Sequence, residues 1–317
     1  MNIKKTVLVA FGLAASVTGA QAQDWPSRPI TMIVPYNPGG TTDILARLAA
    51  EAIAQAVGQP VIVENKPGAG GVVGASLAAQ APNDGYTIFF GNNATNVVQP
   101  LINPAVQYDP AADFDGIATT ADAASFIGVN ADLGIETLDE FIAWLGANRA
   151  MYGTAGVGSM GQFTAELFLM ETGTEATHIP YPGSNDAMAA VMSGEIAFMM
   201  DPVVAQQAGS GRINVIAALT PERHPNVPDV PTATELGHDV VISGWFGVFA
   251  PDGTDPALIA AMSAPLQELV ASDSYRAQVL SMGLLPNYRD PAAVDAVVEQ
   301  DLETFGRIRD AAEISIN

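Results

Sequence analysis

Two glycine-rich loops in this sequence have the residue types and spacing of an anion-binding site. The first, residues 35–43, reads PYNPGGTTD and lies between an apolar run at 30–34 and residues with helical spacing from Thr42 onward. A helix that begins just after a glycine pair directs unpaired backbone N–H groups and the positive end of its dipole at one point. Such a helix start binds an anion without a lysine or arginine side chain.

The second loop, residues 155–161, reads AGVGSMG and has similar surroundings. We expect a strand at 151–154 and a helix at 162–170. The glycines also match the G-x-G-x-x-G fingerprint of dinucleotide-binding proteins, but no following strand ends in an acidic residue at the required distance. We therefore interpret this loop as a second anion-binding helix start. The alternatives are an exported oxidoreductase that uses a nicotinamide cofactor and a tight turn without a ligand.

Groups that could catalyse a reaction do not assemble in this sequence. The three histidines, His178, His224 and His238, lack the paired spacing of metal ligands, and the chain contains no cysteine. Ser159 does not fit a nucleophile elbow, because Val157 occupies a position where that motif requires glycine. The sequence therefore predicts a binding protein and not an enzyme, with no metal and no cofactor.

The chain is strongly acidic, with 34 Asp and Glu against 12 Lys and Arg and a formal net charge of −22. Nucleic acid is a poor partner for such a surface, because phosphate binding requires clustered Lys and Arg. The acidic excess favours solubility, and steering of cationic ligands is the functional alternative. A small anion would approach against the mean field, so its binding would depend on local dipoles such as those of the two loops.

The first 22 residues have the composition of a secretory signal peptide. Lys4 and Lys5 precede an apolar run at 7–17, and small residues lead to Ala22, after which we expect cleavage. The apolar run is too short to span a bilayer. The mature chain would have 317 − 22 = 295 residues and, after the loss of two lysines and no acid, a formal charge of −24.

A mature chain of this length fits two domains better than one. Its first part alternates strands and helices, which implies a parallel sheet covered on both faces. The predicted strands are residues 30–34, 61–63 and 86–90, and the predicted helices are 42–57 and 72–80. Polar residues 91–96 follow the third strand at its carboxyl end, where open α/β sheets bind ligands.

A second unit of the same design follows. Thr137 and Glu140 form a capping-box pattern that predicts a helix start. We place the domain crossing near Asp122 and the return in the proline-rich segment 221–231. Three helical patterns close the chain, and residues 103–113 read as irregular. The predicted domain I comprises residues 23–122 and 233–317, and domain II comprises residues 123–232.

Six stretches spread along the mature chain carry a family resemblance. They read WPSRPITMIVPYNPGGTTDILAR, GQPVIVENKPGAGGVVGA, DGYTIFFG, YGTAGVGSMGQFTAELF, IPYPGSNDAMAAVMSGEIAFMMD and GWFGVFAPDGTD. In this order they resemble the tripartite tricarboxylate transporter solute-binding proteins, also called Bug proteins. The resemblance implies a periplasmic binding protein of the type II-like α/β class. Two domains with parallel-rich sheets, joined by a two-segment hinge, would close on a ligand.

The resemblance also implies a ligand, partners and site residues. The ligand is a small mono-, di- or tricarboxylic acid, the partners are membrane permease subunits, and the protein is expected to be a monomer. Backbone amides and hydroxyls of the two loops would hold the carboxylates. Carried onto this sequence, the ligand-binding residues are Tyr36, Gly39, Gly40, Thr41, Thr42, Asp43, Asn92, Asn93, Thr95, Ala155, Gly156, Val157, Gly158, Ser159, Tyr181 and Asp201.

Some of these residues have an alternative role. Asp43 stands in the first turn of its helix, where a carboxylate interacts favourably with the dipole and could also orient the loop. Asp201 precedes a proline and is an N-cap candidate. In a cleft it would instead accept a hydrogen bond from an ammonium, amide or hydroxyl group of a substituted acid. Tyr36 and Tyr181 could be core aromatics. Gln162 stands where relatives often have histidine, which leaves the identity of the acid open.

A second function is compatible with the same residues. A periplasmic sensor subunit would capture a carboxylate in the same way and present it to a signalling receptor. Nothing in the sequence separates sensing from transport.

Overall fold

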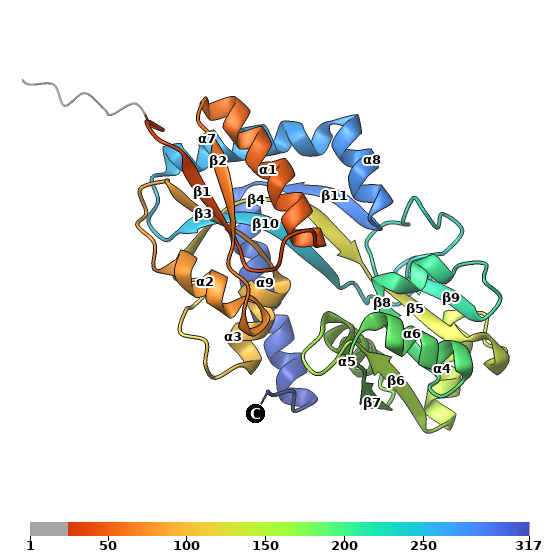
Figure 1. Cartoon of the computed structure of the whole chain (residues 1–317). Coiled ribbons are helices and arrows are strands. Elements are labelled where there is room, and N and C mark those ends of the chain that lie inside the picture. Colours follow the sequence, from red (N-terminus) through yellow and green to blue (C-terminus); the bar gives the residue numbers. More distant parts are fainter. Residues whose placement is uncertain (1–24, 317) are drawn as a thin grey trace, which may run out of the picture.

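The computed structural model describes residues 25–316, so the predicted signal peptide lies outside the described residues. These residues form one sheet of six strands and one of five, with helices on their faces. Figure 1 shows the sheets in two lobes, which we call domain I and domain II. The predicted two-domain α/β architecture is confirmed. None of the helices in this part of the chain is both long and apolar enough to cross a membrane.

The sheet of domain I has parallel strands on one side and antiparallel strands on the other. β1 (Ile30–Val34) pairs in parallel with β2 (Val61–Asn65) and with β3 (Thr87–Asn92). β10 runs antiparallel to both its neighbours, because the chain enters it on the way back from domain II. The order is β11-β4-β10-β3-β1-β2, with β4 (Phe114–Ala124), β10 (Ser243–Pro251) and β11 (Leu284–Arg289).

Helices cover both faces of this sheet. One face carries α1 (Thr41–Val57), α7 (Pro256–Ala271) and α8 (Asp273–Ser281), packed through apolar side chains such as Leu45 and Met262. The other face carries α2 (Val72–Ala79), α3 (Gln99–Ile102) and α9 (Pro291–Ala311). Coverage on both faces explains why most residues of β1, and the four central residues of β3, are buried.

Domain II repeats this plan with fewer strands. β6 is parallel to β7 and β8, whereas β5 is antiparallel to β8 and β9. The capping box predicted for α4 is confirmed, since Thr137 and Glu140 each accept a hydrogen bond from the other's backbone N–H. The order is β7-β6-β8-β5-β9, with β5 (Phe126–Asn130), β6 (Ala150–Thr154), β7 (Ala176–Pro180), β8 (Phe198–Asp201) and β9 (Ile213–Ala218). The helices are α4 (Leu138–Ala147), α5 (Met160–Thr172), α6 (Ser184–Ser193) and the 3-10 helix η4 (Pro202–Gln207).

The chain passes between the two sheets twice. It leaves domain I at the end of β4, which reaches Ala124, and enters domain II at the start of β5, Phe126. It returns between β9 and β10, where Thr232 forms an isolated bridge with Ala218. The first crossing is short, whereas the return takes up the segment between Ala218 and Ser243. Two crossings between domains are typical of proteins whose domains close on a ligand by a hinge.

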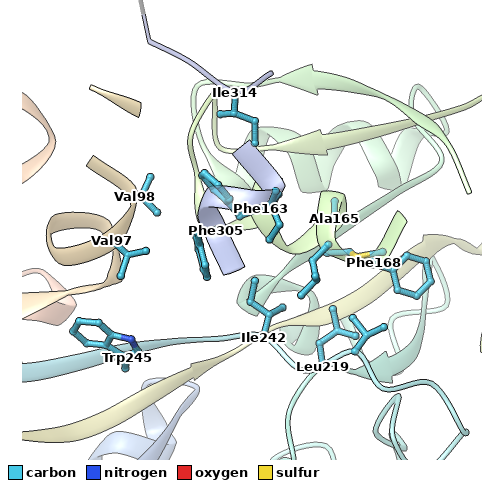
Figure 2. Packing of buried hydrophobic residues seen from close by; sticks show 14 of the residues in the cluster. Val97, Val98, Phe163, Ala165, Phe168, Leu219, Ile242, Trp245, Phe305 and Ile314 are labelled. Carbon is cyan, nitrogen blue, oxygen red and sulfur yellow. The ribbon is translucent and has the colours of Figure 1, made fainter. Parts of the chain in front are cut away.

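One apolar core also runs through both domains. The first half of α9 packs on β4, where Gly116 leaves room for Val294. Its second half reaches domain II, where Phe305 stacks on Phe163 of α5 with the ring centroids 5.0 Å apart. Figure 2 shows both rings among core residues of the two domains, with Ile314 of the C-terminal segment beside them. The domains are thus joined by helix packing as well as by the two crossings.

Three features of domain I were not predicted from the sequence. β11 reads LLPNYR, and its proline and polar residues do not give the pattern of a strand. In the structure it is an edge strand that pairs with β4. Helical turns occupy residues 94–98 and 99–102, so the first of them takes up part of the polar segment 91–96 that follows β3. β3 also continues two residues beyond its predicted end, so Asn92 belongs to the strand.

Candidate ligand-binding site

The predicted binding residues come from one edge of each sheet. β1, β2 and β3 are parallel and lead into the first loop, the turn before α2 and Asn93, while β6, β7 and β8 lead into the second loop, the start of α6 and η4. The carboxyl ends of parallel strands meet at one edge of a sheet. In Figure 1 the starts of α1 and α5 lie on the sides where the two lobes face each other. The topology therefore places the two glycine loops on facing edges.

The first loop presents an open helix start. Gly39 has a φ of +88°, which glycine adopts without strain, and Gly40 is the N-cap of α1 in an extended conformation. Among the described residues, no side chain caps this helix. Gly39, Gly40 and Thr41 are exposed, and a Cβ on Gly39 would meet no atom within 4 Å outside its chain neighbours. The N–H groups of the first turn of α1 are therefore accessible to a ligand.

Asp43 holds this loop in position. Its carboxylate accepts hydrogen bonds from Nε of Arg47 at 3.0 Å, from Nη2 of Arg47 at 2.9 Å and from the Gly39 N–H at 2.9 Å. Asn65, at the end of β2, donates to the same carboxylate at 2.9 Å. The hydrogen bond from Arg47 is the main reason that the pKa of Asp43 falls to about 2, although burial opposes the shift. Asp43 thus orients the loop, and the Gly39 N–H, predicted as a ligand donor, is used within it.

Tyr36 and Asn92 lie together beside the first loop. The Tyr36 hydroxyl donates to Oδ1 of Asn92 at 3.3 Å, and both side chains are half-buried. Burial raises the pKa of Tyr36, although the hydrogen bond to Asn92 acts in the opposite direction. Gly71 lies against the ring, since a Cβ there would be 3.2 Å from the Tyr36 hydroxyl oxygen. Tyr36 is therefore a neutral hydrogen-bonding group at the side of the loop.

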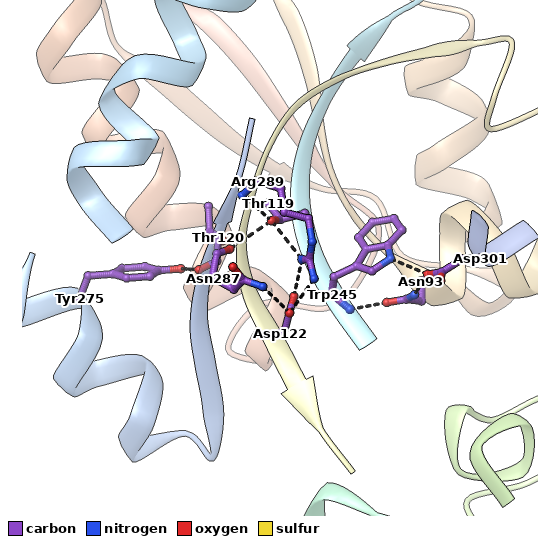
Figure 3. A network of polar contacts seen from close by, with 9 residues as sticks. All are labelled: Asn93, Thr119, Thr120, Asp122, Trp245, Tyr275, Asn287, Arg289 and Asp301. Carbon is purple, nitrogen blue, oxygen red and sulfur yellow. Dashed lines mark hydrogen bonds and ion pairs between the residues drawn. The ribbon is translucent and has the colours of Figure 1, made fainter. Parts of the chain in front are cut away.

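Asn93 and Thr95 are not placed to contact a ligand. Asn93 is 2% exposed; its amide donates to Asp301 of α9 at 2.8 Å, and its oxygen accepts from the Trp245 N–H (Figure 3). Thr95 is fully buried and donates to the carbonyl of Asn92. The π-helical turn at 94–98 directs these side chains into domain I, so we leave both residues out of the site.

The second loop is closed by the first turn of its own helix. Ser159 is the N-cap of α5, and its hydroxyl oxygen accepts from the Gln162 N–H at 3.4 Å. The Gln162 side chain reaches back and accepts from the Gly158 N–H at 2.8 Å. The Ser159 N–H donates to the Gly156 carbonyl at 3.3 Å. The Gly156 N–H donates to Oγ1 of Thr154 at 3.3 Å. Three predicted donors, the N–H groups of Gly156, Gly158 and Ser159, are therefore already bonded, and Ser159 offers its hydroxyl hydrogen instead.

The two loops share one supporting contact that the sequence analysis missed. In each loop, a side chain four residues ahead accepts a hydrogen bond from a glycine N–H: Asp43 from Gly39 and Gln162 from Gly158. The Ser-x-x-Gln pattern at 159–162 is a capping-box signature and could have revealed the second contact. In the first loop the accepting side chain is the carboxylate of Asp43, which is paired with Arg47, whereas in the second loop it is the neutral amide of Gln162.

Thr154 and His178 support the second loop from within the sheet. Oγ1 of Thr154 lies 2.6 Å from Nε2 of His178 and donates to the Gly156 carbonyl at 3.0 Å. Burial lowers the pKa of His178. This contact between neighbouring strands gives His178 a structural role.

Tyr181 points away from the loops. Its hydroxyl donates at 3.0 Å to Glu195, which precedes β8 at the opposite edge of the sheet. Its backbone N–H donates to the Thr154 carbonyl at 2.9 Å and lies at the edge that carries the loops. Tyr181 is therefore a packing residue, and we do not retain it in the site.

Asp201 lies at the same edge as the second loop. It caps η4, with Oδ1 accepting from the Val203 N–H at 2.9 Å, and Oδ2 accepts from the Ser184 hydroxyl at 2.7 Å. Burial raises the pKa of Asp201, and the two hydrogen bonds oppose that shift. The carboxylate also borders α5, since a Cβ on Gly161 would lie 3.7 Å from Oδ2. Asp201 is thus an N-cap that also faces the start of α5.

Asp201 and Ser184 line a cavity of about 620 Å³ between the domains. Gly283 and Leu284 of domain I contribute to its opposite wall, and neither glycine loop lines it. Ser184 was not among the predicted residues, although it is the first residue of a helix that follows the carboxyl end of a strand. That position is the sequence signal that would have identified it.

The second loop touches domain I directly. Gly158 has a φ of +75°, and a Cβ there would collide with Cδ1 of Ile102 in α3. Ile316, near the C-terminus, lies close to the same glycine and donates its N–H to the Ile102 carbonyl at 3.3 Å. Only glycine satisfies both the backbone angle and this close approach.

The site as a whole combines helix starts, hydroxyl groups and one largely buried carboxylate. Among residues 25–316, no three His, Asp or Glu side chains are arranged to hold a metal ion. Such a set of groups binds and orients a small molecule through hydrogen bonds. The excess of N–H donors at the start of α1 favours an anion.

Comparison with known proteins relates this arrangement to a family of receptors. Residues 45–314 match the family model described as the tripartite tricarboxylate transporter family receptor. The chain is similar to protein BugT of Bordetella pertussis, with 32% identity over 307 residues that cover 95% of this chain and 93% of BugT.

Solved structures share the fold. An R. palustris protein solved with adipate is 30% identical, with a TM-score of 0.72 over 92% of this chain and 99% of that chain. MatC from Rhodopseudomonas palustris, solved with bound malate, is 27% identical, with a TM-score of 0.68 over 90% of this chain and 99% of that chain. These similarities support the type II-like periplasmic binding protein fold.

Proposed function

Because the chain belongs to the tripartite tricarboxylate transporter receptor family, we propose that it is a periplasmic solute-binding protein that captures a small mono-, di- or tricarboxylic acid between its two domains. Its structural relatives from R. palustris were solved with adipate and with malate, which are both small dicarboxylates. The groups of the candidate site should therefore be suited to binding a carboxylate.

The observation that carries the proposal is the open start of α1. Its N-cap is glycine, no described side chain caps it, and the loop before it is exposed. Aligned peptide dipoles give a helix start about half a positive charge, and the first N–H groups lack partners in the helix. In a chain with a formal charge of −22, such a point is a strong local attraction for a carboxylate.

The proposed site contains fewer residues than the site predicted from the sequence. Gly39, Asp43, Gly156 and Gly158 position the loops and do not donate to the ligand. In domain I the binding groups are the backbone N–H groups of Gly40, Thr41 and Thr42, with Tyr36 and Asn92 beside them. In domain II they are the loop residues Ala155, Val157 and Ser159, together with Asp201.

Each domain supplies only part of this site, so capture requires both. We infer that the ligand stabilises the arrangement in which the two edges face each other, and that membrane permease subunits of the transporter recognise this closed form. A sensor subunit that presents the closed form to a signalling receptor would use the same site. Membership of a transporter receptor family favours delivery to a permease.

A thermal-shift screen of mono-, di- and tricarboxylates tests the proposal. A ligand that binds only the folded protein adds about 2.7 kcal/mol to the free energy of unfolding at 100 times its Kd. At least one small acid should therefore raise the melting temperature in a saturable way, whereas the corresponding amides should not. A folded protein that responds to none of these acids would contradict the proposed function.

A further inference from the structure

The cavity of about 620 Å³ beside Asp201 is bounded by both domains. Domain II contributes η4 and the start of α6, and domain I contributes the turn between α8 and β11. The segment that returns to domain I adds His224 and Asn226. The described residues that line this cavity include one acid, Asp201, and no Lys or Arg.

Asp201 is a largely buried carboxylate without a cation. Both of its hydrogen bonds come from neutral donors, the Ser184 hydroxyl and the Val203 N–H. A carboxylate has about four lone-pair positions, so it can accept further hydrogen bonds. Burial without a countercharge disfavours the ionised form and raises the pKa of Asp201. A ligand group that brings a positive charge or a hydrogen-bond donor would offset this cost.

His224 belongs to the same cavity wall but is itself buried. It is 1% exposed, and its Nδ1 accepts from the Asn226 N–H at 3.1 Å, which places the proton of the neutral ring on Nε2. Nε2 has no hydrogen-bond partner among the described residues. Burial lowers the pKa of His224, and the carbonyls of Gly283 and Leu284 oppose that shift. The neutral His224 ring is therefore part of the buried wall of the cavity, and its Nε2–H lies near these two backbone carbonyls.

The start of α6 adds further donors next to Asp201. Its N-cap, Gly183, is extended and makes no side-chain cap, and the next two residues, Ser184 and Asn185, line the cavity. An uncapped helix start favours a carboxylate. The cavity thus places the N–H groups of a helix start beside an acceptor for a cation.

We propose that this cavity is a subsite for the ammonium group of an amino-substituted carboxylic acid, with Asp201 as its acceptor. The inference rests on the proposed function and specifies the class of acid. An ammonium group satisfies Asp201 best because it supplies charge as well as hydrogen bonds, and a hydroxyl group supplies hydrogen bonds alone. The expected order of affinity is amino acid, then hydroxy acid, then unsubstituted acid.

Calorimetric titration with two matched series tests this order. The first series is aspartate, malate and succinate, and the second is glutamate, 2-hydroxyglutarate and glutarate. Within each series only the substituent on one carbon changes. In the wild-type protein the amino acid should bind at least about tenfold more tightly than the unsubstituted acid, which corresponds to one charge-assisted hydrogen bond.

Asp201→Asn should remove this preference. Asparagine also caps helices well, so the variant is expected to fold, and its melting temperature checks this. Asp186→Asn is the matched control, because it removes an exposed carboxylate from the first turn of the neighbouring helix α6, and Asp186 does not line the cavity. The control should keep the wild-type order of affinities.

The outcomes separate the two proposals. An unsubstituted acid that binds the wild-type protein as tightly as its amino analogue, or a preference that survives in folded Asp201→Asn, would overturn the inference and leave the proposed function standing. If none of the six acids binds, and the broader screen of mono-, di- and tricarboxylates also fails, the proposed function falls and the inference falls with it.

Discussion

At the scale of single residues, Asp301 is the buried acid with the clearest consequence for stability. Its Oδ2 accepts from the Asn93 amide and from the Trp245 indole N–H, each at 2.8 Å, and the Asp122–Arg289 ion pair lies nearby (Figure 3). Burial raises the pKa of Asp301 to about 6, although the hydrogen bonds and the charge of Arg289 oppose the shift. The Asp301 carboxyl group therefore changes its protonation state at mildly acidic pH, where unfolding can be measured.

The folded protein holds the Asp301 proton more tightly than the unfolded chain, whose aspartates titrate near 3.8. Protonated Asp301 thus favours the fold below about pH 4, and this contribution is lost as the pH rises through about 6. The two pKa values differ by an amount worth on the order of 2–3 kcal/mol. Asp301→Asn cannot titrate, so its free energy of unfolding, measured with urea, should depend less on pH across this range.

Asp310→Asn provides a control for this measurement. Asp310 lies on the same helix but its side chain is 70% exposed. Its pH profile should follow that of the wild-type protein. A profile of Asp301→Asn that runs parallel to the wild type from about pH 4 to about pH 7 would show that Asp301 does not titrate as described.

At the scale of elements, the starts of α1 and α5 differ in which hydrogen-bond donors they leave available to a ligand. α1 has a glycine N-cap and leaves its first N–H groups to a ligand. α5 has a serine N-cap whose oxygen accepts from its own helix, which leaves the hydroxyl hydrogen as the group that can donate to a ligand. The difference predicts that α1 contributes backbone amides and α5 contributes a side chain.

Ser159→Ala tests the contribution of α5. The loss of the hydroxyl donor should weaken binding of a carboxylate by roughly 1.5–3 kcal/mol, and the loss of the cap should cost about 0.5–2 kcal/mol of stability. Thr137→Ala is the matched control, since it removes a similar cap from α4, where no binding residue is proposed. It should lose stability but keep wild-type affinity in calorimetric titration. Equal affinities for both variants would exclude Ser159 from the site.

At the scale of the whole molecule, the fold was predictable because its signals are local. Each strand that leads into a glycine loop and a helix start has that order written in consecutive residues, as at 30–45 and 150–165. β11 escaped prediction because LLPNYR becomes a strand only through pairing with β4. Its strand character is thus a property of the tertiary structure.

The candidate site was less predictable, because side-chain directions depend on distant partners. Asn93 turns inward to meet Asp301 of α9, more than 200 positions along the chain, and Tyr181 turns toward Glu195. The support of the first loop by Asn65 likewise requires β2 to lie beside β1. Sequence patterns located both loops correctly but did not show which of their N–H groups are already bonded.

The packing of α9 adds a constraint on how the domains can move. The Phe163–Phe305 stack and the contact between Gly158 and Ile102 both join domain II to domain I close to the second loop. A rotation about the two crossings must preserve or exchange these contacts.

The most direct test is a crystal structure of the protein with the acid that gives the largest thermal shift. A carboxylate of the ligand should lie within hydrogen-bond distance of the N–H groups of Gly40, Thr41 or Thr42, and the same molecule should contact residues 155–159 or Asp201 of domain II. A ligand that contacts one domain alone, or whose carboxylates avoid the start of α1, would contradict the proposed capture between two domains.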